Sequence, residues 1–463
     1  MKNIIYYLLF FYAVICGLTI HFFNGTGDSG DSISHYLFAR YAPIHPGLYF
    51  DHWAKPVFVL LASPFAQLGF TGMKLFNSLI SLVTIFFSYK TAERLNIKNA
   101  ILVAVFMMFS PLFYILTFSG LTEPLFALFT ILGIYFCVNQ KYLSACLVIS
   151  FLPYVRSEGL IIIGVFVIYF FYKKLWKLFP FLFFGSLAYA IAGYFVHGDF
   201  LWVFTKIPYA RLSSVYGSGD LFHFAEQLIN VVGVPLYVLF WMGFAWLVAM
   251  IFKKKTDPEQ HILILLGFSA FFMAHTLFWY LGIFNSMGLK RVLIGVMPLI
   301  ALITLQGFNF ISEELLVQNQ TAKKTVLFML MGYILIFPFT PNLSAIQWKK
   351  DMMLNEEQKL AIEITGFLNA NENLQCTVLF DHPYLSITLN RDYFDLTACK
   401  KISKESISQM KPGDLLVWDD HYSGFEAGIK KNELDVLPGL IKLYSCKSKE
   451  GKREIIFSAY KKK

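Results

Sequence analysis

A succession of apolar runs, each long enough or nearly long enough to cross a lipid bilayer, constrains this sequence more than any other feature. A hydrocarbon core about 30 Å thick requires about 20 apolar residues in a helix. The candidate spans are 4–23, 72–89, 99–117, 122–139, 142–155, 158–172, 178–196, 228–251, 260–282, 292–309 and 325–341. The sequence therefore predicts an α-helical polytopic membrane protein with about 11 transmembrane helices.

The composition changes after residue 341. The whole chain is 57% hydrophobic and 15% charged, whereas ordinary soluble domains carry about 25% charged residues. Residues 1–341 account for this excess of apolar residues, and 342–463 read like a soluble protein. The second part contains three strand-like runs, Cys376–Phe380, Asp414–Trp418 and Glu454–Ser458, and a helical stretch at Glu356–Leu368. We therefore expect a transmembrane module, 1–341, and a small α/β domain, 342–463.

Two polar clusters follow predicted strands of the second domain. They are Phe380-Asp381-His382-Pro383 and Trp418-Asp419-Asp420-His421. Such residues commonly form turns at strand ends. Ligands also bind at the ends of strands in α/β sheets, so a binding role stays open beside the turn-forming one.

Two apolar segments are predicted to differ from simple spans. Residues 4–23 could be mistaken for a signal peptide, but the run is too long and no small-residue cleavage site follows it. We expect a retained first helix. Residues 56–70 are apolar but interrupted by Pro64. They are predicted to form a re-entrant or interfacial segment covered by protein.

The net charge of +9 does not indicate nucleic-acid binding. In the membrane module the basic residues fall mainly in short clusters between apolar runs, which the positive-inside rule explains. The clusters with the most cations are at 90–98, 173–177, 253–255 and 323–324. These clusters are predicted to be cytoplasmic, so the loop at 24–71 and the C-terminal domain would lie outside.

The outer loop at 24–71 concentrates side chains that could form a site. It contains Asp28, Asp31, Asp51, His35, His45, His52, Tyr36, Arg40 and Lys55. Ionisable groups at a membrane boundary are costly unless they face water or a site. One interpretation is a solvated loop in which Asp28 caps a helix. The clustering of acids with histidines and aromatic residues favours a substrate pocket.

Further charged residues fall at other outer helix ends. Glu123 starts a span, where a carboxylate can serve merely as a helix cap. Arg156 and Glu158 could form a local ion pair or line a pocket. Lys290 and Arg291 lie on the side where positive charge is disfavoured, which calls for an anionic partner such as a lipid headgroup or a substrate phosphate.

These residue types suit the transfer of a sugar from a lipid phosphate to a hydroxyl group. The hydroxyl needs a carboxylate base, for which Asp31 and Asp28 are the candidates. The departing phosphate needs cations, for which Arg156, Lys290 and Arg291 are the candidates.

The order of these motifs resembles that of the GT-C superfamily of membrane glycosyltransferases, which use polyprenyl-phosphate sugars. The matching segments are Gly27-Asp28-Ser29-Gly30-Asp31-Ser32, Tyr36, Ala39-Arg40, Asp51-His52-Trp53-Ala54-Lys55-Pro56, Ser119-Gly120-Leu121-Thr122-Glu123-Pro124, Arg156-Ser157-Glu158-Gly159 and Lys290-Arg291. The resemblance implies that an acid of the first outer loop is the base, Asp31 first and Asp28 second. It also implies a bacterial inner-membrane protein with its site outside.

The resemblance does not fix the sugar or the acceptor, and further roles are expected from the residue types themselves. Donor phosphate binding would fall to Arg156, Lys290, Arg291 and Lys55, and substrate binding to His35, Tyr36, His45, Asp51, His52, Glu123 and Glu158. The donor would carry a hexose or pentose, with mannose as the first candidate, and the acceptor would be a glycan, a glycolipid or a protein. Some members carry adjacent acids or Asp-x-Asp, whereas Ser29 and Gly30 separate the two acids here. A divalent metal therefore stays possible.

Other functions remain to be distinguished. A transporter or flippase of a lipid-linked glycan would also need many spans, but its acids are expected within the membrane rather than in an outer loop. A non-catalytic scaffold would not need the carboxylate–histidine cluster. A glycan polymerase or ligase would use a pyrophosphate donor.

Overall fold

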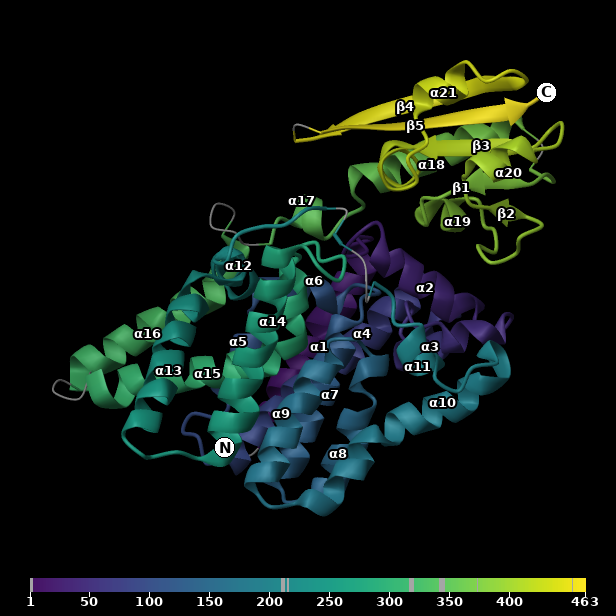
Figure 1. Ribbon diagram of the computed structural model, residues 1–463. Coiled ribbons are helices and arrows are strands. Elements are labelled where there is room, and N and C mark those ends of the chain that lie inside the picture. The colour runs from purple at the N-terminus through teal and green to yellow at the C-terminus, as the bar shows by residue number, and fades with distance from the viewer. Residues whose placement is uncertain are drawn as a thin grey trace.

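The computed structural model describes residues 3–209, 213–214, 216–315, 320–340, 346–372, 374–451 and 453–463. The helical part forms one end of the molecule, and the small sheet domain forms the other end (Figure 1). The predicted boundary between the two, at residues 341 and 342, lies outside the described residues.

Six helical segments of the described chain are long and apolar enough to cross a membrane. They are α1 (Ile4–Phe22), α4 (Phe70–Arg94), η3 with α10 (Trp176–His197), α13 (Val234–Phe252), η4 with α14 (Glu259–Leu281) and the segment Lys290–Glu313, which comprises η5, α15 (Met297–Phe310) and the start of η6 (Ile311–Leu315). The shorter apolar helices are α3 (Pro56–Ala66), α7 (Glu123–Val138), α8 with η2 (Tyr142–Tyr154) and α9 (Gly159–Tyr172). The chain is thus a helical integral membrane protein, as predicted, while the total of about 11 spans stays a prediction.

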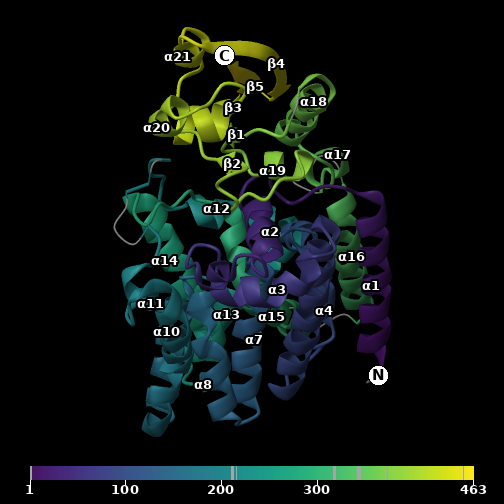
Figure 2. The ribbon, with the colours of Figure 1, turned by 90° about the vertical axis from the view of Figure 1, so that its right-hand side faces the viewer.

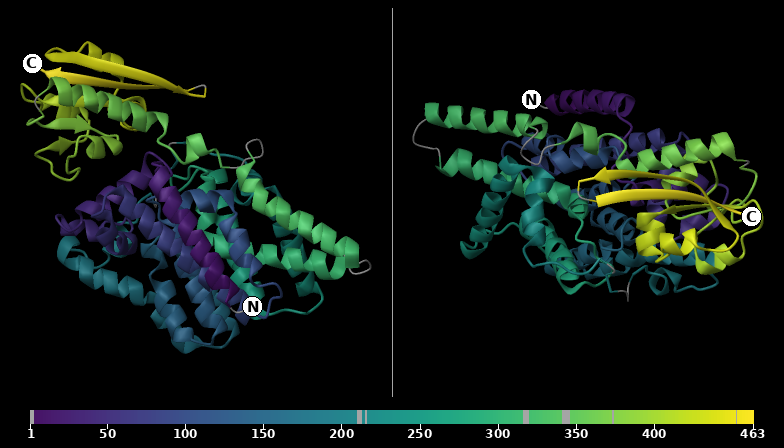
Figure 3. Two further views of the ribbon diagram at one scale, coloured as in Figure 1. Left: turned by 180° about the vertical axis from the view of Figure 1, so that it is seen from behind. Right: turned by 90° about the horizontal axis from the view of Figure 1, so that it is seen from above.

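The remaining helical elements have 11 residues or fewer, except α16 (Gln320–Ile336), which has 17 residues and lies on the side of the bundle (Figure 3). The others are α2 (Asp31–Tyr41), η1 (Pro46–Phe50), α5 (Leu102–Met108), α6 (Pro111–Thr117), α11 (Trp202–Thr205), α12 (His223–Val232), η7 (Phe337–Phe339) and α17 (Trp348–Asp351).

The candidate span at 99–117 is two helices rather than one. Ser110 has extended backbone angles, and Pro111 occupies the first turn of α6. Proline has no N–H to continue a helix and disfavours a helical conformation in the residue before it. The break between α5 and α6 therefore follows from Pro111, which a hydropathy window does not detect.

The helix α15 forms the centre of the bundle and positions one part of the candidate site. Nearly all of its residues are buried. Its backbone lies very close to that of α13, where Gly243 and Gly307 have no side chain. A Cβ built on Gly243 would lie 1.9 Å from the Ile303 carbonyl oxygen, and a Cβ built on Gly307 would lie 1.9 Å from the Leu239 carbonyl oxygen. Small residues permit this close approach of membrane helices. The segment η5 (Lys290–Val296) leads directly into this fixed helix.

The C-terminal domain has the mixed α/β architecture expected from the sequence. Its sheet has the order β2-β1-β3-β5-β4, in which β1 is parallel to β2 and β3, and β5 is antiparallel to β3 and β4. The strands are β1 (Val378–Phe380), β2 (Cys399–Lys400), β3 (Leu415–Asp419), β4 (Leu440–Glu450) and β5 (Arg453–Lys462). The helices are α18 (Glu356–Asn371), α19 (Tyr384–Thr388), α20 (Lys404–Ser408), η8 (Asp420–Glu426) and α21 (Lys431–Asp435). The sequence did not predict β4, which lies at the sheet edge with many exposed positions.

The sheet domain contacts the outer loop of the membrane module, and Figure 2 shows it directly above α2. The Gly25 N–H donates to the Met352 carbonyl at 3.0 Å, and the Gln358 amide donates to Thr26 Oγ1 at 2.8 Å. Farther along the interface, the rings of Phe38 and Phe394 pack edge to face. Polar and aromatic contacts thus join the two parts.

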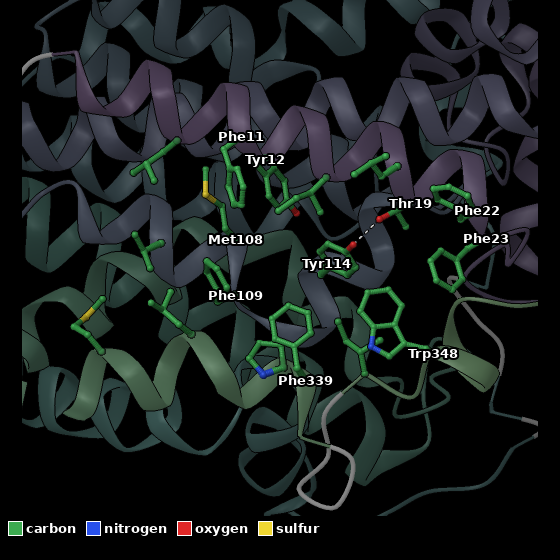
Figure 4. A pocket seen from close by; sticks show the side chains of 18 residues that line it. Phe11, Tyr12, Thr19, Phe22, Phe23, Met108, Phe109, Tyr114, Phe339 and Trp348 are labelled. Atoms are coloured by element: carbon green, nitrogen blue, oxygen red, sulfur yellow. Dashed lines mark hydrogen bonds between the residues drawn. The ribbon is translucent and has the colours of Figure 1, made fainter. Parts of the chain in front are cut away.

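A cavity of about 650 Å³ lies on the side of the bundle between α1, α5, α6 and α16 (Figure 4). Figure 3 shows α1 and α16 on the same side of the bundle. Every residue that lines this cavity is uncharged, and most are aliphatic or aromatic. The cavity therefore contains none of the charged residues that the sequence singled out, and the candidate site lies elsewhere.

Candidate active site

The acidic loop, which we define as residues 26–31, is shaped by Asp28. Its Oδ1 atom accepts hydrogen bonds from the N–H groups of Gly30 at 3.0 Å and Ser32 at 2.9 Å. These are the N–H groups that a helix start leaves unpaired. Asp28 therefore fixes the start of α2, and Asp31 is the first residue of that helix.

A second loop, residues 119–122, packs directly on the start of α2. The Gly120 N–H donates to Ser32 Oγ at 2.7 Å, and a Cβ at Gly120 would lie 2.3 Å from the Ser32 carbonyl oxygen. The Asn77 amide donates to the carbonyls of Ser119 and Leu121. The loop leads into α7, whose first residue, Glu123, is fully buried.

Two arginines connect these acids. The Arg291 guanidinium bonds to Asp28 through Nη1 and to Asp31 through Nη2, while its Nε lies 3.4 Å from Glu123 Oε1. Arg156 Nη1 lies 2.9 Å from the same Glu123 oxygen, and Arg156 Nη2 donates to Glu158 Oε1 at 2.8 Å. The six side chains form one continuous network. The two arginines neutralise the buried Glu123 carboxylate, whose burial without a cation would be very costly.

The Asp31 carboxylate is more exposed than that of Asp28 and accepts fewer hydrogen bonds. The Asp31 side chain is 43% exposed, against 26% for Asp28. Its Oδ1 accepts no hydrogen bond from the residues that the structure describes, whereas both oxygens of Asp28 are used. Burial would raise the pKa of Asp31, but Arg291 and the other nearby cations outweigh it and hold this pKa below its usual value. Asp31 is therefore charged at neutral pH and able to accept a proton.

Lys55 adds a cation from the second half of the outer loop. Its φ of 69° lies in the left-handed region, which residues other than glycine rarely adopt. Residues in such strained backbone conformations cluster at functional sites. Its ammonium donates to Ser157 Oγ at 3.1 Å, and it forms no ion pair with any residue in the described part of the chain. Burial lowers the pKa of Lys55 to about 8, with Arg156 contributing in the same direction.

His35 lies one turn after Asp31 on α2 and is buried. Its ring stacks on Trp53 with the centroids 5.0 Å apart. Burial, reinforced by Lys55, Arg156 and Arg291, lowers the pKa of His35 to about 3 although Asp31 opposes the shift. The imidazole is therefore neutral and forms part of an aromatic wall beside the acids.

Comparison with known proteins gives one informative match. No protein-family model and no curated protein matches the sequence. The crystal structure of ArnT from Cupriavidus metallidurans in the apo state matches with a TM-score of 0.64 at 11% identity, covering 99% of this chain and 98% of that one. This chain has the ArnT fold. Because ArnT is a GT-C glycosyltransferase, the resemblance found from the motifs is confirmed at the level of the fold.

Within the ArnT fold, several residues expected at the site make contacts elsewhere. Lys290 is exposed and forms no ion pair among the described residues. His45 Nε2 lies 2.8 Å from Asp392 of the sheet domain, and the His52 ring bonds to the Val203 carbonyl at 3.1 Å. Asp51 accepts a bond from the Ala54 N–H, and Tyr36 packs edge to face on Phe70. These residues shape the outer loop and its interfaces.

The acids do not combine into a metal site in the described part of this ArnT-like fold. No group of three or more His, Cys, Asp or Glu side chains there could hold a metal ion. Asp28 and Asp31, which could supply carboxylate ligands, are both bonded to Arg291. The donor set therefore does not fit a divalent cation.

Two side chains of the sheet domain reach the acidic loop, although the sequence did not single them out. Ser29 Oγ donates to Glu357 Oε2 at 2.6 Å, and the Tyr422 hydroxyl lies against Gly30. Glu357 falls in the first turn of a predicted helix, where acids are common. Tyr422 directly follows the polar cluster 418–421, whose possible binding role was the one available signal.

Proposed function

We propose that this chain is a membrane glycosyltransferase that moves a sugar from a polyprenyl-phosphate donor to an acceptor hydroxyl at the outer face of the membrane. The ArnT fold supports a lipid-linked sugar transferase in general. The observation that carries the proposal is the meeting of Asp31, Arg291, Glu123, Arg156 and Glu158, which come from separate segments, in one network with Lys55 beside it.

In the proposed reaction Asp31 is the general base. Its carboxylate accepts the proton of the acceptor hydroxyl, whose oxygen forms a bond to the anomeric carbon of the sugar. The bond between that carbon and the phosphate oxygen breaks, and polyprenyl phosphate leaves with both bonding electrons. Arg291 holds Asp31 in its ionised form and fixes its orientation.

Lys55 is the main cation for the donor phosphate in this proposal, and Arg156 has a lesser part. Arg156 is already bonded to Glu123 and Glu158, so it offers little unused charge. The Lys55 ammonium donates to the Ser157 hydroxyl and pairs with no carboxylate among the described residues. Its positive charge is therefore available to bind an anion. A cation placed where negative charge grows on the leaving group stabilises the transition state.

For the sugar and the acceptor we propose only the chemical class. The neutral ring of His35, stacked on Trp53, provides a flat apolar surface on which a sugar ring can pack. Glu158, which Arg156 and the other neighbouring cations keep ionised although burial opposes this, can accept a bond from a sugar hydroxyl. A hexose or pentose donor and a glycan, glycolipid or protein acceptor fit these groups.

The direct test is a transfer assay with the full-length protein in nanodiscs. Polyprenyl-phosphate sugars with a radiolabel in the sugar would be supplied together with a membrane extract as acceptor source. We expect label to move to an acceptor while polyprenyl phosphate is released. Movement of intact donor across the bilayer, with no cleavage of the sugar–phosphate bond, would instead establish a flippase.

Donor binding is expected to weaken as the pH rises through about 8. Lys55 binds an anion only in its protonated form, and its pKa is lowered to about 8. The KM for the donor should therefore rise between about pH 7 and pH 9, whereas the phosphodiester donor does not titrate there. Initial rates at several donor concentrations would measure this.

The matched control for this prediction is Lys55→Arg, because a guanidinium stays charged throughout this range. The KM of that variant should not depend on pH in the same interval. If wild type and Lys55→Arg show the same pH profile, Lys55 does not bind the donor phosphate.

A further inference from the structure

Two side chains of the sheet domain contact the two residues that separate the candidate bases. Ser29 Oγ donates to Glu357 Oε2 at 2.6 Å, and both side chains are buried. A Cβ built on Gly30 would lie 2.2 Å from the Tyr422 hydroxyl oxygen. The span of backbone between Asp28 and Asp31 is therefore covered by the sheet domain.

The Tyr422 side chain is fixed by its own domain. Asp419, which is fully buried, accepts bonds from the N–H groups of His421 at 3.0 Å, Tyr422 at 2.6 Å and Ser423 at 3.3 Å. The His382 ring packs edge to face on the Tyr422 ring with the centroids 5.0 Å apart. The phenol is thus presented to the acidic loop by a rigid turn at the end of β3.

Glu357 is fixed in the same way. Its Oε1 atom lies 3.0 Å from Arg453 Nη1 and 3.3 Å from His421 Nδ1, which leaves Oε2 to accept the Ser29 hydroxyl. These partners come from η8 and β5, so Glu357 joins the acidic loop to the central strands of the sheet domain.

The contact with Tyr422 gives a reason for the glycine at position 30. The φ of Gly30 is −109°, so no left-handed φ demands a glycine here, although its ψ of −93° lies outside the main α and β regions. The space where a Cβ would lie is instead taken by the phenol oxygen, and the ring carbon that carries it is 3.4 Å away. Any side chain at this position would displace either the loop or Tyr422.

We infer that Tyr422 and Glu357 are positioning residues for the acidic loop, so that Asp31 is held in its working place only while the sheet domain is docked. This inference rests on the proposed function, in which Asp31 is the base. Burial, together with Asp28, Glu357 and Asp31, raises the pKa of Tyr422, which agrees with a neutral phenol lying against the acidic loop. A displacement of about 1 Å at a reacting group can cost about 100-fold in rate.

A cycle of four proteins tests the contact: wild type, Gly30→Ala, Tyr422→Phe, and the double variant. Gly30→Ala should lower kcat about 100-fold because the new methyl group displaces the acidic loop. Tyr422→Phe should change kcat by only a few-fold, since the ring remains. In the double variant the methyl group meets only the ring at about 3.4 Å, so kcat should return to near the Tyr422→Phe value.

The control for the substitution itself is Gly366→Ala on α18, where nothing lies within 4 Å of the added Cβ. Its kcat should equal that of wild type, and its melting temperature should be equal or slightly higher because alanine is the better helix former. The inference is overturned if Gly30→Ala is fully active, or if the double variant is as impaired as Gly30→Ala. The second result would mean that the backbone at Gly30, and not Tyr422, rejects a side chain.

Melting temperatures of the same four proteins separate this inference from the proposed function. The loss of melting temperature in Gly30→Ala should also be relieved by Tyr422→Phe, whether or not a substrate is present. If wild type transfers no sugar while the melting temperatures still show this compensation, the proposed function fails and the contact stands. If wild type is active but neither kcat nor melting temperature shows compensation, the contact fails and the function stands.

Discussion

Asp31→Asn is expected to lower kcat about 10²- to 10⁴-fold, the range that a positioned general base contributes. The amide cannot accept the hydroxyl proton, yet it has nearly the same size and keeps an oxygen that can accept a bond from Arg291. Donor affinity and melting temperature should therefore change little. Single-turnover rates, donor binding and thermal melting of the purified variant would test the three expectations together.

Two carboxylates of the same outer loop provide matched controls. Asp51 accepts one bond from the Ala54 N–H, and an Asn there retains that acceptor, so Asp51→Asn should keep wild-type turnover. Asp28→Asn retains the acceptor for the N–H groups of Gly30 and Ser32. It should impair turnover less than Asp31→Asn does. Wild-type turnover in Asp31→Asn, or a larger loss in Asp28→Asn, would transfer the role of base to another group.

Arg291→Ala is expected to have the largest effect on stability. Its guanidinium contacts Asp28, Asp31 and Glu123, and the Glu123 side chain is fully buried. Removing one partner from a buried ionic network leaves an uncompensated charge and costs about 3–5 kcal/mol. Titration with a denaturing detergent would measure the loss in the free energy of unfolding, and transfer activity should be lost as well.

The adjacent Lys290 makes a close control for this prediction. It has the same charge and belongs to the same 3-10 helix, but it is exposed and pairs with no described acid. Lys290→Ala should therefore leave stability within about 0.5 kcal/mol of wild type, as surface substitutions usually do. Equal effects of the two substitutions would show that the Arg291 network does not contribute to stability.

Local sequence was sufficient where one residue type dictates a structure. Asp28 lies two residues before Gly30, the N-cap of α2, and its carboxylate accepts the Gly30 and Ser32 N–H groups at the helix start. Arg156 and Glu158 are two residues apart and form the ion pair that this spacing allows. The apolar run at 99–117 did not reveal that the helix breaks at Pro111, because apolar content alone carries no signal for the break.

Sequence spacing could not show which charged residues meet. Lys290 and Arg291 are neighbours of equal charge, yet only Arg291 joins the acids, because its side chain points toward the start of α7 and the acidic loop. Tyr422 lies almost 400 residues from Gly30, and no local pattern connects them.

The sequence by itself determined that this protein lies in a membrane and carries a small α/β domain. Long apolar runs are what helices need to cross a bilayer, and charged residues spread along the C-terminal part are typical of a domain in water. The sequence also supplied the acids and cations. Only the tertiary structure decided which of them form one network, because that depends on how α15 packs in the bundle and how the sheet domain docks on the outer loop. Those arrangements arise from packing between distant segments, which the order of residues along the chain does not reveal.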